Sequence, residues 1–166
     1  TASVLFVIGN LHLWNVDYEQ ADNYFNAAAD IFSEAVGEET YEYQMAHGNS
    51  AIVRALQGDD EGAFAKTVEL LEVQDRDYRQ AFRFVSEASM AAYFNQLGNS
   101  LDLLVNLVLL DDDPSTEVIS EGATWVMRRK GFILDTIMDF RGAQRLAEND
   151  EELSEAWRTY AMARQQ

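Results

Sequence analysis

The residues best suited to acid-base or metal chemistry are two histidines, His12 and His47, in a chain with 29 acidic residues. A dimetal carboxylate bundle needs inward-facing Glu-x-x-His pairs, but Gly9 and Gln44 stand three residues before the histidines. The chain has no nucleophile elbow, no glycine-rich phosphate loop and no cysteine, although residue types alone leave a Ser-His-Asp triad open. We therefore expect structural histidines, no metal or cofactor, and a non-catalytic chain.

A second kind of chemistry is peptide binding by asparagine. The amide groups of Asn10 and Asn49 can donate to and accept from a peptide backbone, which allows an extended segment to be held with little sequence preference. The same residues could instead contact neighbouring helices, and the sequence leaves both readings open. The residues expected to line a peptide groove are Phe6, Asn10, Leu13, Trp14, Met45, Asn49 and Ile52.

The third candidate is a basic cluster, Arg128-Arg129-Lys130-Gly131. Apolar residues cover most of this helix when it is drawn at about 100° per residue, so we expect the helix to be central and largely buried, with Lys130 in its apolar stripe. A buried cation must be paired. We therefore predict that Asp102, on the preceding apolar helix, bonds Arg129 or Lys130, as a structural network or as part of a docking patch for another domain.

The two histidines and the expected peptide-binding residues lie within a pattern of small and large residues at helical spacing. The first copy of the pattern consists of Leu5, Ile8, Gly9, His12, Ala21, Phe25 and Ala28. It resembles a tetratricopeptide (TPR) repeat, in which small residues let two antiparallel helices approach closely. A weaker copy follows 42 residues later, with His47, Ser50 and Thr67 at positions that are usually large and apolar. Phe6 replaces the Lys of a carboxylate clamp, so a terminal carboxylate is not the expected ligand.

Helical periodicity runs along almost the whole chain, and no segment alternates as a strand would. We predict an all-α fold, a TPR-like α-α superhelix of antiparallel helix pairs over residues 1–75 that continues into a helical extension over residues 76–166. Asp17 is expected to cap the second helix, and Pro114 to occupy the first position of a long helix. The expected helices are 2–14, a second one after Asp17 that ends at 35, 40–56, 61–73, a short helix within 86–96, 101–110, 114–147 and a last one ending at 163.

Composition narrows the function classes. A hydrophobic fraction of 48% and a single proline among 166 residues fit a continuously folded chain. The net charge of -17 disfavours nucleic acid, which is bound by clustered Lys and Arg. We read the acidity as a solubility feature, with salt adaptation or a basic partner left open. No apolar run approaches the roughly 20 residues that span a bilayer, and no signal peptide opens the chain, so we expect a cytoplasmic protein.

The order of the later motifs resembles the region before the catalytic domain of bacterial CHAT-domain proteins. The similar segments are Ala81-Phe82, Ser86-Glu87, residues 100–104 (Ser-Leu-Asp-Leu-Leu) and residues 126–135 (Val-Met-Arg-Arg-Lys-Gly-Phe-Ile-Leu-Asp). CHAT domains resemble caspases and use a His-Cys dyad, which this chain lacks. The resemblance implies a regulatory helical scaffold that leads into an effector domain absent from this chain, so we expect a piece of a longer protein.

Together these observations predict a non-catalytic scaffold for protein-protein interaction, whose concave groove receives a protein or peptide. The alternative is a structural or oligomerisation module of an unrelated signalling protein, in which repeat ends stack weakly between chains. An enzyme is the third and least favoured class.

Overall fold

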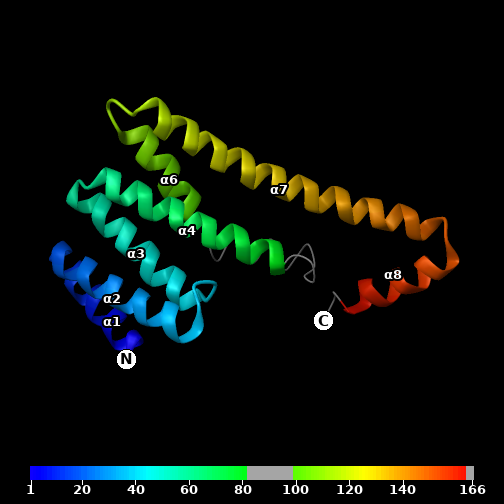
Figure 1. Ribbon diagram of the computed structural model, residues 1–166, viewed down its shortest axis with the longest axis horizontal. Coiled ribbons are helices and arrows are strands. Elements are labelled where there is room, and N and C mark those ends of the chain that lie inside the picture. The colour runs from blue at the N-terminus through cyan, green and yellow to red at the C-terminus, as the bar shows by residue number, and fades with distance from the viewer. Residues whose placement is uncertain (82–98, 164–166) are drawn as a thin grey trace. The chain divides into compact units, whose positions relative to one another are not determined.

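The structure is a computed structural model that describes residues 1–81 and 99–163, and every regular element among these residues is an α-helix. The predicted all-α class is therefore confirmed for this part of the chain. Figure 1 shows the helices, and their bounds are α1 Ala2–Trp14, α2 Tyr18–Val36, α3 Tyr41–Gln57, α4 Asp60–Ala81, α6 Asn99–Leu110, α7 Thr116–Glu148 and α8 Glu151–Ala163.

Most predicted helix bounds lie within one or two residues of the observed ones, with two corrections. Helix α4 continues past its predicted end at Val73 to Ala81, because buried Gln74 and Tyr78 extend its inward face and no Gly or Pro stops it. Helix α7 begins after Pro114, since the hydroxyl of Ser115 accepts the backbone N–H of Val118 (3.2 Å) and caps the helix. The helix predicted within 86–96 lies outside the described residues.

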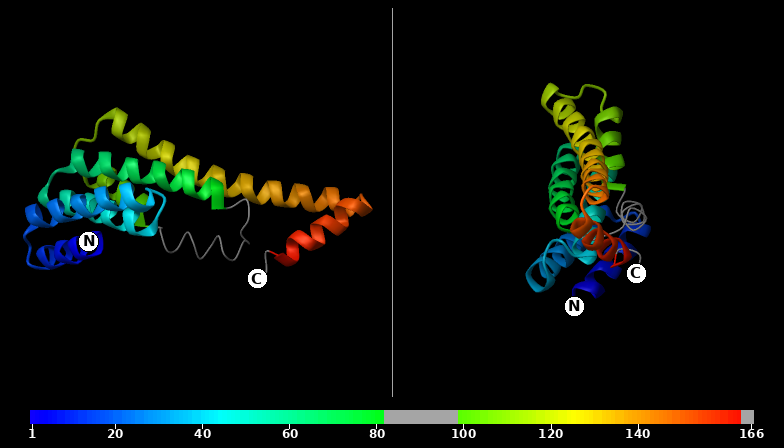
Figure 2. Two further views of the ribbon diagram at one scale, coloured as in Figure 1. Left: turned by 60° about the horizontal axis from the view of Figure 1, so that its bottom comes forward. Right: turned by 90° about the vertical axis from the view of Figure 1, so that its right-hand side faces the viewer.

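The described residues divide into two compact units. The first contains residues 1–77 and 99–122, and the second contains residues 78–81 and 123–163. In the first unit α1 packs on α2 and α2 on α3, while α3 also touches α6. In Figures 1 and 2, α1 lies at the outer edge of this unit. Within the described ranges, no helix is both long enough and apolar enough to cross a membrane.

The close approach of α1 and α2 depends on Gly9, as the repeat pattern predicts. A Cβ atom at this position would lie 2.8 Å from ring atoms of Phe25, which is fully buried. Ala21 and Ala28 on α2 are also fully buried. Gly9 therefore leaves the space that the large Phe25 ring fills, while Ala21 and Ala28 pack in clusters with residues of α3.

The turns that join the helices differ in their chemistry. Gly58 ends α3 in the left-handed conformation (φ 78°), as expected of a helix C-terminus. The turn between α1 and α2 places Val16 at φ 62°, a strained conformation for a β-branched residue. Asp17 holds the N-cap position of α2 but makes no capping hydrogen bond, because its carboxylate lies 2.9 Å from Nδ1 of His12. The predicted capping role of Asp17 is therefore wrong.

Candidate functional site

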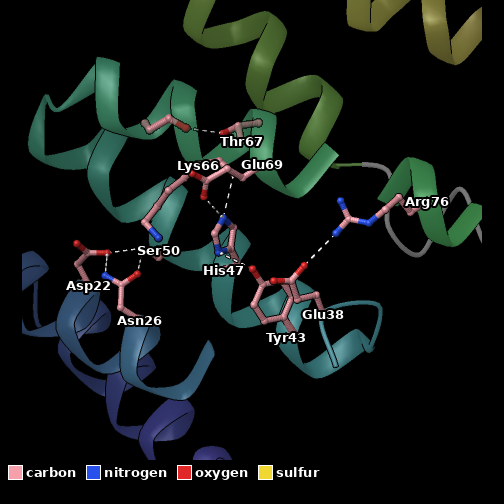
Figure 3. A network of polar contacts seen from close by, with 11 residues as sticks. Asp22, Asn26, Glu38, Tyr43, His47, Ser50, Lys66, Thr67, Glu69 and Arg76 are labelled. Carbon is pink, nitrogen blue, oxygen red and sulfur yellow. Dashed lines mark hydrogen bonds and ion pairs between the residues drawn. The ribbon is translucent and has the colours of Figure 1, made fainter. Parts of the chain in front are cut away.

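Polar contacts link α3 to α2 on one side and to α4 on the other, where an apolar core would be expected (Figure 3). We call these contacts the polar network. Its centre is Ser50 on α3, whose fully buried hydroxyl donates to the carboxylate of Asp22 on α2. The hydroxyl also lies 3.0 Å from Oδ1 of Asn26, and the amide of Asn26 donates to Asp22 (2.9 Å). These bonds among the three side chains offset part of the free-energy cost of burying their polar groups.

Arg54 carries the network from the centre to the next turn. Its guanidinium lies 3.3 Å from the carboxylate of Asp22 and 3.1 Å from that of Asp59. Asp59 in turn accepts the backbone N–H of Gly62 (3.0 Å) and so caps α4. One guanidinium thus ties α2, α3 and the start of α4 together.

His47 forms the second half of the network, on the next inward position of α3. Its Nε2 donates to the backbone carbonyl of Lys66 on α4 (3.1 Å), and the hydroxyl of Tyr43 lies 3.4 Å from Nδ1. Burial and the nearby positive charge of Lys66 lower the pKa of His47 from 6.5, with exposed Glu69 opposing the shift at 3.4 Å. The ring is therefore a neutral donor. Its structural role was predicted from the repeat positions of the histidines.

Two further groups in this region have shifted pKa values. Burial, with the negative charge of Glu38 next, raises the pKa of Tyr43 to about 12, so the phenol stays protonated. Burial and the charge of Arg54 lower the pKa of Lys66, and Asp22 opposes the shift. Both shifts follow from packing in the interface rather than from an open cleft.

The network lacks the arrangement that hydrolytic catalysis needs. Ser50 is inaccessible to a substrate and bonds a carboxylate directly. Neither histidine bonds a serine in the described part of the chain, since His12 pairs with Asp17 and stacks on Tyr24 (ring centroids 5.2 Å apart). No group of three or more His, Cys, Asp or Glu residues among the described ones could hold a metal ion. The network instead holds helices in register.

The predicted peptide-binding residues fall into three environments. Phe6 and Leu13 pack into the cluster of buried residues around Phe25. Asn10 donates to the carbonyl of Phe6 (2.9 Å), which leaves its side-chain oxygen as an acceptor. The exposed fraction is 78% for Trp14 and 40% for Ile52, while Met45 and Asn49 are half-buried.

The predicted ion network on α7 needs a correction. Lys130 is exposed rather than buried, and α7 is not largely buried, because several of its apolar side chains face solvent: Met127 at 69%, Leu134 at 60% and Met138 at 68% exposed. Periodicity misled here, since a helix with apolar residues on most sides does not reveal which side is covered.

The inward residue of the basic cluster is Arg129, whose guanidinium lies 4.5 Å from the ring centroid of Tyr78. Arg128 lies over Trp125 at 5.0 Å. These cation-π contacts stay within the second unit. Asp102 is exposed on α6 in the first unit, and its bond to Arg129 or Lys130 stays a prediction.

Sequence reasoning did not find Asp22, Asn26 or Arg54 as network members. A usable signal was present, because the second copy of the repeat pattern has polar residues at three positions expected to be large and apolar. Buried polar groups require partners, and those partners had to come from the facing helices.

Comparison with known proteins identifies no relative of this chain. No protein-family model matches the chain, and no curated protein or solved structure matches it with significance. The class of the protein therefore rests on its own fold: residues 1–81 and 99–163 contain helices as their only regular elements, and α1 packs on α2 and α2 on α3.

Proposed function

We propose that the chain is a non-catalytic module for protein-protein interaction that binds an extended segment of another protein along the first helix of each pair. The TPR-like superhelix predicted from the repeat pattern belongs to this proposal. In it, α1 and α3 line one groove, and α2 and α4 support them from behind.

The observation that carries the proposal is a pair of equivalent accessible positions. Trp14 on α1 is 78% exposed, and Leu56, which lies 42 residues later on α3, is 52% exposed. One turn nearer the N-terminus of each helix lie the equivalent residues Asn10 and Ile52. Asn10 is half-buried, and Ile52 is 40% exposed. An exposed tryptophan beside amide acceptors is typical of interfaces, where aromatic anchors carry much of the binding energy.

The partner chemistry follows from these side chains. The apolar surfaces of Trp14 and Leu56 favour apolar anchors on the bound segment, and the side-chain oxygen of Asn10 can accept a backbone N–H from it. Asn49 on α3 supplies a second amide. The bound segment is therefore an extended peptide with apolar side chains, bound without a terminal carboxylate.

The resemblance of residues 126–135 to CHAT-associated proteins extends the proposal to a larger protein. We propose that the module is the regulatory region of a bacterial CHAT-domain protein and positions the effector domain of that protein. The sequence of the complete parent gene tests this part: a His-Cys dyad in a following domain supports it, and a parent without such a domain contradicts it.

The binding proposal is tested by selecting peptides from a displayed random library against the intact chain. We expect Trp14→Ala and Leu56→Ala each to lower the affinity for the selected peptides roughly tenfold, which corresponds to a loss of about 1.4 kcal/mol of binding free energy. The double substitution of Asn10 and Asn49 to alanine is expected to weaken binding further. The matched control is Leu134→Ala, another exposed leucine, in the second unit. Peptides that bind the Trp14→Ala and Leu56→Ala variants as tightly as the original chain contradict the proposal.

A further inference from the structure

Helix α1 carries apolar side chains on a face that no other described helix covers. Val4 is 55% exposed and Leu11 is 48% exposed, with Ile8 half-buried between them. On α2, the helix that packs on α1, the apolar residue Ile31 is 42% exposed. Although the net charge of the chain is -17, no Asp, Glu, Lys or Arg occurs between Thr1 and Val16.

The repeat register shows what such a face does elsewhere in this chain. The residues 42 positions after Val4 and Leu11 are Ala46 and Val53 on α3, and both are fully buried. Ala46 packs in one cluster with Ala28 and Ala29 of α2, while Val53 packs in a second cluster with Ala21 and Phe25; these contacts dock the second pair on the first.

The same equivalence holds for the second helix of each pair. Ile31 on α2 corresponds to Val73 on α4, which is only 4% exposed and belongs to the cluster around Ala46. Two helices of one pair therefore expose the positions that, in the next pair, form an interface. We call Val4, Ile8, Leu11 and Ile31 the outer face.

One position distinguishes the outer face from its buried counterpart and indicates the chemistry of the occupant. Ile8 stands where α3 has Ser50, which bonds Asp22 and Asn26 of α2. An isoleucine side chain forms no hydrogen bond. A docked helix that carried residues equivalent to Asp22 and Asn26 would therefore bury a carboxylate and an amide without a hydrogen-bond partner on α1.

We propose that the outer face docks a further helical hairpin whose second helix is lined by alanine, as α2 is, but is apolar where α2 has Asp22 and Asn26. The outer face offers no charged side chain, so the occupant needs no complementary charge there. Leu11 lies three residues from Trp14 on α1, so the outer face borders the proposed peptide groove. The two proposals are read out by different measurements, the thermal midpoint of the extended protein and the affinity for selected peptides, and can therefore fail independently.

The test adds such a hairpin to the intact chain. A 42-residue extension that repeats residues 1–42, with Asp22→Leu and Asn26→Ala in the added copy, is placed before Thr1 so that the register is kept. We expect one cooperative thermal transition with a midpoint raised by roughly 5 °C or more, since a stacked repeat adds an interface to the whole array. An extension with Asp22 and Asn26 retained is expected to raise the midpoint less.

Variants assign the effect to the outer face. Leu11→Glu in the original α1 is expected to abolish the rise in the extended protein, yet to shift the midpoint of the unextended chain by less than roughly 2 °C, because the side chain is exposed there. The matched control is Leu110→Glu, at a leucine of α6 that is 80% exposed and belongs to neither proposed surface, and it keeps the rise.

Three results would overturn the proposal. The extension unfolds in a separate transition and leaves the original midpoint unchanged, or the rise survives Leu11→Glu. In the third, sedimentation shows that the unextended chain is a dimer and that Leu11→Glu dissociates it into monomers. A second copy of the chain is then the occupant of the outer face.

Discussion

The two helix pairs of the first unit share one register but bury different chemistry. Phe25 on α2 and Thr67 on α4 occupy equivalent positions, and both are fully buried. The phenylalanine fills the space beside Gly9, whereas the threonine hydroxyl donates to the carbonyl of Ala63 in its own helix (2.7 Å). At this position both pairs bury the side chain, but the first pair buries an aromatic ring and the second a hydrogen-bonded hydroxyl.

This difference changes the meaning of the second copy of the repeat pattern. Judged by residue type, His47, Ser50 and Thr67 look like decay of an apolar repeat. In the structure each of the three side chains is buried and hydrogen-bonded. The bonds of His47 and Ser50 cross to other helices, and hydrogen bonds are directional, so these contacts specify one register more strictly than apolar contacts of the same size.

The largest expected contrast comes from truncating the equivalent residues Phe25 and Thr67. Phe25→Ala should lower the free energy of unfolding by about 3–5 kcal/mol, because it leaves a large cavity between α1 and α2. Thr67→Ala should cost only about 1 kcal/mol, since its hydroxyl bonds within its own helix. Urea denaturation followed by circular dichroism measures both, and equal losses would show that the two pairs do not differ in this way.

The next contrast concerns the polar interface against a surface ion pair. Asp22→Ala should cost about 2 kcal/mol, because it leaves the Ser50 hydroxyl and Arg54 without their shared partner. Adding Ser50→Ala should cost less than the sum of the two single changes.

The matched control for this contrast is Glu38→Ala. Glu38 pairs with Arg76 at 2.9 Å, and the two side chains are 44% and 50% exposed. We expect a loss below about 1 kcal/mol because solvent screens this pair. A loss as large as that of Asp22→Ala, measured in the same urea experiment, would contradict the special role of the interface.

A smaller contrast separates two helical glycines, Gly9 and Gly48. Gly9→Ala should destabilise the chain by about 1–2 kcal/mol, because the new methyl group meets the rigid Phe25 ring. At Gly48 a Cβ atom would lie 3.2 Å from a methyl group of Leu70. The Leu70 side chain is flexible and can move aside. There the gain in helix propensity should offset the strain to within about 0.5 kcal/mol. Thermal denaturation midpoints compare the two variants directly.

The smallest effect is expected at the turns inside the pairs. Val16→Gly should stabilise the chain by about 0.5–1 kcal/mol, since glycine removes the strain of φ 62° at some cost in chain entropy. Gly58→Ala, in the equivalent turn of the second pair, should destabilise it by about 1 kcal/mol. If Val16→Gly lowers the melting temperature, the strain assigned to this turn is absent.

Much of the fold could be read from local patterns. Helix α1 has the predicted bounds, because its helical spacing and the turn that follows are encoded within a few residues of each other. The structural role of His47 and the close approach at Gly9 were also predicted correctly. The partners of Ser50 were not predicted, since Asp22 and Asn26 lie on another helix and nothing in local spacing links them to α3.

The sequence by itself determined the all-α class, the 42-residue register and the inward positions of each pair, since these depend on helical periodicity and on residue size. Only the tertiary structure decided that buried Ser50 meets a carboxylate while the equivalent Ile8 on α1 remains partly open. It also decided that Lys130 faces solvent while Arg129 lies against Tyr78. The reason is physical: periodicity gives each side chain a direction around its helix, but burial and bonding depend on which other helix arrives on that side.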